Sequence, residues 1–98
     1  MIALKKEPDK DIMLTTVDNE LKALQEAVGG YVEAVTIASD VVILCDEEGR
    51  IKGKPYCCSF ANIDFCGTIL VVGVKDEEFC DLSAQAGVEV RKMIKVKR

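Results

Sequence analysis

The pattern of apolar residues after residue 18 predicts a short helix that ends at two glycines. Its apolar residues share one helical face: Leu21, Leu24, Ala27 and Val28. Asp18 is placed to cap the first turn, and Gly29-Gly30 can end the helix because glycine adopts the left-handed conformation without steric cost. We therefore predict a helix over 18–28. Because isolated helices of about ten residues are unstable in water, it must pack on other elements.

A strand is predicted next, over residues 31–37. Side chains alternate between the two faces of a strand, so Glu33 shares a face with Val35 and Ile37. Either these larger residues face the core and carry a carboxylate with them, or they face outward around it.

The following residues predict a hairpin and then an irregular segment. Residues 41–45 are continuously apolar, which is typical of a strand covered on both faces. Residues 46–49 are predicted to form a hairpin loop that leads into a return strand over 50–53, and the whole of 31–53 is read as strands and hairpin. Residues 54–66 show no clear period and are predicted to be an irregular loop.

The two ends of the chain complete a single small α+β domain over residues 1–98. We predict a hairpin over 1–17, strands within 67–82 and a helix over 83–94 that Ser83 caps. Strands on both sides of a helix, with two hairpins, favour a mixed or antiparallel sheet of about five or six strands. Both short helices are expected on one face of that sheet.

The residue composition excludes several kinds of site. Histidine is absent, so no Ser-His or Cys-His nucleophile is possible. The cysteines are Cys45, Cys57, Cys58, Cys66 and Cys80. An odd number without an export signal predicts free thiols in the cytoplasm. Adjacent cysteines such as Cys57-Cys58 are poor ligands for one zinc ion, and we expect neither a metal nor a cofactor.

The charge distribution argues against nucleic acid and membranes as partners. The net charge is −4, although the last eight residues hold five of the 13 Lys and Arg residues. An acidic body disfavours a nucleic-acid footprint. No apolar run approaches the roughly 20 residues that cross a bilayer.

Acidic residues are the first candidates for a site, and they are Glu33, Asp46, Glu47, Glu48 and Asp64. Carboxylates can bind Mg²⁺ or transfer protons, and a metal-dependent hydrolase that uses Glu33, Asp46 and Asp64 is the last-ranked hypothesis. Asp46 to Glu48 fit an ordinary solvated loop. Glu33 and Asp64 are better candidates because both lie beside apolar positions, but a structural salt bridge to Arg50 or Lys52 would explain them as well.

The segment from Pro55 to Asp64 carries the second group of candidates. Tyr56, Phe60 and Asn62 combine aromatic rings with an amide, which suits contact with a ligand or a partner. The structural alternative is that Tyr56 and Phe60 close the end of the core.

Three segments give the chain a family resemblance. They read LQEAVGGYVE (24–33), CDEEGRIKGKP (45–55) and DFCGTILVVG (64–73). In order and spacing they resemble domain of unknown function 3846, a family of small proteins carried by phages and integrative elements. The resemblance implies a mobile-element accessory protein and supplies no reaction.

Our leading hypothesis is therefore a non-enzymatic accessory protein that binds a host protein or associates with itself. The alternative is a protein that binds or sequesters a nucleotide-like ligand. In that case Tyr56 and Phe60 would stack on the base, and Arg50, Lys52 and Lys54 would meet the phosphates.

Self-association is predicted from the expected layers. Two short helices cover one face of a five-stranded sheet, so the second face would expose apolar residues unless a symmetric dimer covered it. The alternative is that residues 54–66 fold back over that face and leave a monomer.

Overall fold

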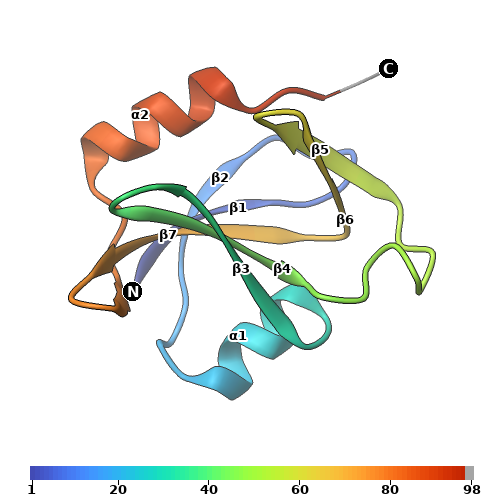
Figure 1. Cartoon of the computed structure of the whole chain (residues 1–98), viewed down its shortest axis with the longest axis horizontal. Helices are drawn as coiled ribbons and strands as arrows, with labels where there is room; N and C mark the ends of the chain where they lie inside the picture. Colours follow the sequence, from blue (N-terminus) through green and yellow to red (C-terminus); the bar gives the residue numbers. More distant parts are fainter. Residues whose placement is uncertain (97–98) are drawn as a thin grey trace.

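A computed structural model describes residues 1–96 of the chain (Figure 1). Within this part, the elements in chain order are β1 (Ile2–Lys6), β2 (Met13–Thr16), α1 (Leu21–Val28), β3 (Val32–Ala38), β4 (Val41–Asp46), β5 (Tyr56–Phe60), β6 (Ile63–Cys66), β7 (Ile69–Lys75), β8 (Glu78–Cys80) and α2 (Ala84–Met93).

Six strands form one antiparallel sheet in the order β2-β1-β7-β4-β3, with β8 pairing with one end of β7. β5 and β6 form a separate two-stranded antiparallel sheet. The predicted α+β class and the predicted number of strands are confirmed. The two continuously apolar strands, β4 and β7, pair with each other at the centre, as burial on both faces requires.

The two helices cover opposite faces of the sheet, so the prediction that both lie on one face is wrong (Figure 1). α1 packs Leu24 and Val28 against the face that presents Val42 and Leu44. α2 packs Val90 over the other face of the same strands. Because β4 and β7 are apolar on both sides, each face of the sheet needs a cover of its own, and a helix packed on one face leaves the other face uncovered.

Residues 54–66, predicted to be an irregular loop, contain the β5–β6 hairpin, which covers the same face as α2 (Figure 1). Ala61 and Asn62 form its turn with φ of 49° and 67°, the left-handed values of a tight hairpin turn. The strand pattern was hidden because Cys57, Cys58 and Ser59 are all buried. Ser59 exchanges backbone hydrogen bonds with Lys95, so the C-terminal segment covers the outer edge of β5.

This hairpin removes the physical reason for the predicted dimer. The second face of the sheet is covered within the chain by Cys58, Phe60, Phe65 and Val90. Residues 54–66 fold back over this face of the sheet, which is the alternative that the sequence left open. No argument from a bare apolar face remains for self-association.

Other predicted boundaries are partly correct. α1 begins after Glu20, with no side-chain cap, so the proposed cap by Asp18 is wrong. Ser83 caps α2 as predicted, accepting a hydrogen bond from the Ala86 N–H at 3.1 Å. Residues 50–53 form turns rather than a return strand, because β4 leads into a loop and not into a second hairpin. The last short strand, Glu78–Cys80, lies within the range 67–82 predicted to hold strands.

Within residues 1–96, neither helix is long enough and apolar enough to cross a membrane.

Candidate functional site

Asp46, at the end of β4, is the centre of a buried ion cluster. Its carboxylate is inaccessible to solvent and lies 3.0 Å from the Lys52 amine and 2.7 Å from the Lys54 amine. It also accepts a hydrogen bond from the Glu48 N–H at 2.9 Å. We call Asp46, Lys52 and Lys54 the Asp46 cluster. A buried carboxylate needs such partners, because charge without compensation is costly away from water.

Glycines allow the cluster to pack against the end of α1. The Lys54 amine donates to the carbonyl oxygens of Val28 and Gly29 at 3.0 and 2.9 Å, which places a positive charge at the helix C-terminus. Gly29 has the predicted left-handed conformation, with φ of 77°. A Cβ on Gly30 would overlap the Asp46 carboxylate, and one on Gly67 would lie 2.7 Å from the Lys54 side chain.

The protonation of Asp46 follows from these contacts. Burial by itself raises the pKa of the carboxyl group, but hydrogen bonds from Lys54, the Glu48 N–H and Lys52, with the charge of Lys54, outweigh burial and lower the pKa to about 2. Asp46 is therefore ionised at neutral pH. It acts as the fixed anion that holds both lysines.

The cluster joins the three sequence segments that carry the family resemblance. The first supplies Gly29 and Gly30, the second supplies Asp46 and both lysines, and the third supplies Gly67. The loop that follows β4 is fixed by these contacts. Two other residues of this loop, Arg50 and Ile51, are exposed beside β3 and β6.

A cavity of about 420 Å³ lies between β3, this loop and β6. Its walls carry Glu33 and Val35 from β3, Arg50 and Ile51 from the loop, and Ile63 from β6, among others. The Arg50 guanidinium donates to the Asp64 carbonyl oxygen at 3.1 Å, which ties the loop to β6. Ile51 is 85% exposed, an unusual position for a large apolar side chain.

A second cavity, of about 330 Å³, lies further along the same strand. It is lined by Ile37 at the end of β3, by Phe60 from the hairpin, and by Glu89 and Met93 from α2. Glu33, Val35 and Ile37 project to the same face of β3. We call these three side chains, with the cavities beside them, the β3 groove.

β3 is also an edge strand, because among the described residues it pairs only with β4. The Tyr31 carbonyl oxygen accepts a hydrogen bond from the Glu47 N–H at 2.8 Å. Hydrogen-bonded and non-hydrogen-bonded residue pairs alternate along an antiparallel ladder, so this bond shows which residues of β3 bond to β4. Residues 33 and 35 therefore direct their backbone groups toward β4. The N–H and C=O groups of Val32, Ala34 and Thr36 point away from it, along the open edge.

Comparison with known families gives one result. The family model described as "Domain of unknown function (DUF3846)" matches residues 1–95. The chain belongs to this family. The match confirms the resemblance seen in the three segments and spans every element described above. No curated protein and no solved structure matches the chain.

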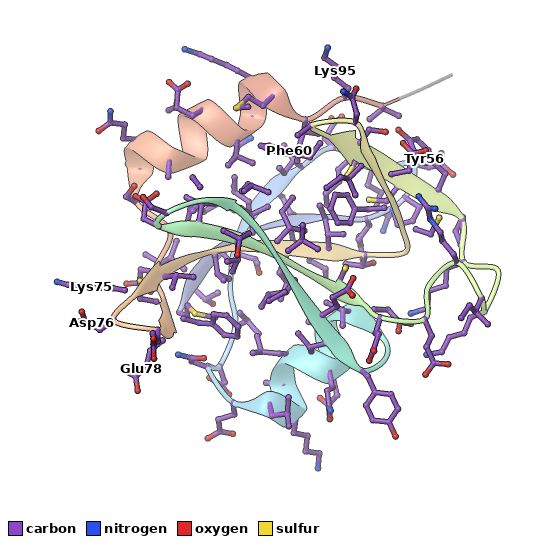
Figure 2. All side chains as sticks on the ribbon, viewed as in Figure 1. Tyr56, Phe60, Lys75, Asp76, Glu78 and Lys95 are labelled. Carbon is purple, nitrogen blue, oxygen red and sulfur yellow. The ribbon has the colours of Figure 1, made fainter. Side chains whose placement is uncertain are left out.

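The basic and aromatic candidates are used mainly within this DUF3846 chain. Lys52 and Lys54 are held by Asp46, so the expected pairing of Lys52 with Glu33 or Asp64 is wrong. Phe60 is 3% exposed and closes the core, as the structural alternative proposed. The Tyr56 hydroxyl lies 2.7 Å from the Ser59 hydroxyl, and Figure 2 shows Tyr56 and Phe60 on the hairpin close to Lys95.

The remaining candidates divide into two groups. Glu33, Arg50 and Asp64 line the same cavity, as a shared site requires. Asn62 lies in the exposed hairpin turn and is not among the residues that line either cavity. Asp64 accepts a hydrogen bond from the Ser59 hydroxyl at 2.5 Å, so its carboxylate helps to hold the hairpin.

Acidic and cysteine side chains form no recognisable metal centre in residues 1–96. All five cysteines are free thiols, with Cys45, Cys57 and Cys58 buried. Burial, together with the nearby Glu33 carboxylate, raises the pKa of Cys45 to about 11. This thiol is therefore protonated and unreactive at neutral pH.

Sequence reasoning missed the two features that define the site. Asp46 was assigned to an ordinary loop, although it directly follows an apolar run and precedes two lysines, at 52 and 54, of opposite charge. The open edge of β3 left no signal at all, because strand order is set by contacts between distant residues.

Proposed function

We propose that this protein is a non-enzymatic accessory protein that binds another polypeptide by adding an extended segment of it to β3. The observation that supports this is the open edge beside the β3 groove. Unpaired backbone groups on an edge strand are a template for a further strand, and neighbouring pockets then select its side chains.

β3 has little protection against such pairing. Edge strands usually avoid unwanted partners by being short, charged or interrupted by proline. In the part of the six-stranded sheet that the structure describes, the other strands with an open side are β2 and β8, which have four and three residues. β3 has seven residues, no proline and one charged side chain, Glu33, and its bulge lies only at its end, between Thr36 and Ala38.

The family resemblance suggests the setting. A mobile-element accessory protein acts in the cytoplasm of its host, so we propose a host protein or a protein of the element as the partner. The nucleotide-binding alternative has less support, because Phe60 is buried and Lys52 and Lys54 already neutralise Asp46.

A peptide library can test the proposal without knowledge of the partner. Random peptides displayed on phage are selected on the wild-type protein and on Ala34→Pro, which removes an outward N–H donor without touching the bonds to β4. Proline is tolerated on an edge strand where its N–H would face solvent. We expect peptides that bind the wild type and lose binding to Ala34→Pro.

Thr16→Pro is the matched control, because it removes an outward N–H from β2, the edge at the other end of the sheet. It should retain the peptides. Amide hydrogen exchange should slow at Val32, Ala34 and Thr36 when they bind. Peptides that bind both variants equally, or protect amides elsewhere, would contradict the proposal, as would a library that yields no binder.

A further inference from the structure

Both ends of the β3 groove carry exposed acidic side chains. Glu33 and Glu47 line the cavity beside the loop, and Asp40 and Glu89 line the cavity beside α2. Within residues 1–96, Arg50 is the one cation that lines these two cavities. Asp46 adds no net negative charge to this field, because the two lysines paired with it carry more positive charge than it carries negative charge.

Asp46 is held by two lysines, whereas these carboxylates lack close ion pairs of that kind within residues 1–96. Glu89 lies 3.8 Å from Lys92, but both side chains are more than half exposed, and solvent screens such a pair. No ion pair within 4.0 Å is found for Glu33, Asp40 or Glu47 in the part of the chain that the structure describes. The groove therefore attracts positive charge.

We infer that the segment added to β3 is basic at both ends and apolar between them, with the pattern basic–x–apolar–x–basic. This inference rests on the proposed function, since it assumes that β3 accepts a strand. Charge complementarity of this kind selects partners and speeds their encounter.

The pattern follows from the register of an added strand. Side chains of neighbouring strands lie about 4.5–5.5 Å apart when directly opposite, and alternate residues share a face. One basic residue would lie opposite Glu33, within reach of Glu47. The residue two positions along would lie opposite Val35 and should be apolar. The next would lie near Ile37, where Asp40 and Glu89 favour a second basic side chain.

The same charges argue against a second copy of the chain as the partner. Pairing of two β3 strands would bring two acidic grooves together, and like charges close to each other across strands are destabilising. The covered second face of the sheet offers no apolar surface in compensation. A basic segment of a different protein could pair with the open backbone groups of β3 and also complement the acidic side chains of the β3 groove.

Two synthetic peptides test the inference. Their sequences are Thr-Lys-Thr-Val-Thr-Lys-Thr and Thr-Glu-Thr-Val-Thr-Glu-Thr, each with a fluorescent label, and binding is followed by anisotropy. Exposed ion pairs contribute modestly, so we expect the lysine peptide to bind about threefold to tenfold more tightly. The preference should fall as salt is raised, because the groove is exposed.

Glu33→Lys should remove most of this preference. Glu26→Lys makes the same charge change on the exposed side of α1, across the sheet, and should preserve it. Thermal melting followed by circular dichroism confirms that both variants are folded. Loss of the preference in Glu33→Lys alone is the result that supports the inference.

Three outcomes would overturn it. Equal or tighter binding of the glutamate peptide would reject the basic pattern while the edge proposal stands. Self-association of the wild type that Ala34→Pro abolishes would identify a second copy as the partner. If neither peptide binds, and the library also yields no binder at β3, the inference and the proposed function fail together.

Discussion

The Asp46 cluster and the β3 groove lie side by side but treat charge in opposite ways. Asp46 is directly opposite Val32 in the β3–β4 ladder, one residue along from Glu33. Asp46 is buried and held by two lysines, whereas Glu33 is exposed on the groove face. Two carboxylates on neighbouring strands therefore have different roles: one fixes the loop, and the other faces whatever approaches the edge.

This difference shows how a polar motif can mislead. Lys52 and Lys54, which looked suited to binding phosphates, belong to the Asp46 cluster. The residues of the same loop that line the neighbouring cavity include Arg50 and Ile51. A charge that its own chain compensates stabilises the fold. A charge without such compensation beside open backbone groups is available for binding.

The largest expected effect comes from removing the central anion. Asp46→Asn should destabilise the protein by about 2–4 kcal/mol, because it leaves two lysine amines beside a buried neutral group. Urea unfolding measures this. Glu47→Gln, the adjacent exposed carboxylate, should change stability by less than about 0.5 kcal/mol. Equal effects of the two substitutions would show that Asp46 is not the centre of the loop.

The contribution of Asp46 should also depend on pH in a defined direction. Its pKa of about 2 in the folded protein lies below the value of about 3.9 for an unfolded aspartate. The carboxylate therefore stabilises the fold above about pH 4, and this stabilisation is lost as the pH falls toward 2. The stability difference between the wild type and Asp46→Asn should shrink over that range. A difference that is constant from pH 7 to pH 2 would contradict the ion cluster.

Two glycines with nearly equal positive φ allow the cost of backbone strain to be separated from the cost of a packing clash. Gly29 and Gly53 have φ of 77° and 75°, but a Cβ at Gly29 would lie 2.8 Å from the Lys54 amine, and one at Gly53 would meet nothing within 4 Å. Gly53→Ala should cost about 1 kcal/mol from backbone strain. Gly29→Ala should cost about 1–3 kcal/mol because it also displaces Lys54 from the helix end. Melting curves of the two variants measure this difference in stability, and equal losses would show that displacing Lys54 costs nothing.

The smallest effect is expected on the open edge. Thr36→Lys places a charge on an exposed side chain whose backbone groups face away from β4, so stability should change by less than about 0.5 kcal/mol. Peptide binding at β3 should nevertheless fall, since lysine on an edge strand opposes further pairing. A loss of more than about 1 kcal/mol in urea unfolding would mean that the edge is covered within the chain.

Sequence patterns predicted the elements that depend only on residues close together in the chain. The stripe ending at Val28, the glycine stop at Gly29 and the cap at Ser83 were all found because each depends on residues within one or two turns. The β5–β6 hairpin was missed because Cys57 and Cys58 are both buried and do not alternate with polar residues. Among the candidate residues, Glu33 and Arg50 line one cavity, whereas Phe60 and Lys52, which were assigned to a nucleotide-like ligand, are used in the core and in the ion pair with Asp46.

The family, the α+β class and the two strands at the centre of the sheet could be predicted without a structure, because apolar runs and turn residues act over short distances. Three features could not be predicted in this way: the helices take opposite faces, Asp46 meets Lys54, and β3 is left at the edge. Each of these depends on contacts between residues far apart in the chain, and such contacts leave no periodic trace in the sequence. The proposed binding surface arises at that level, since an edge exists only once the order of the strands is fixed.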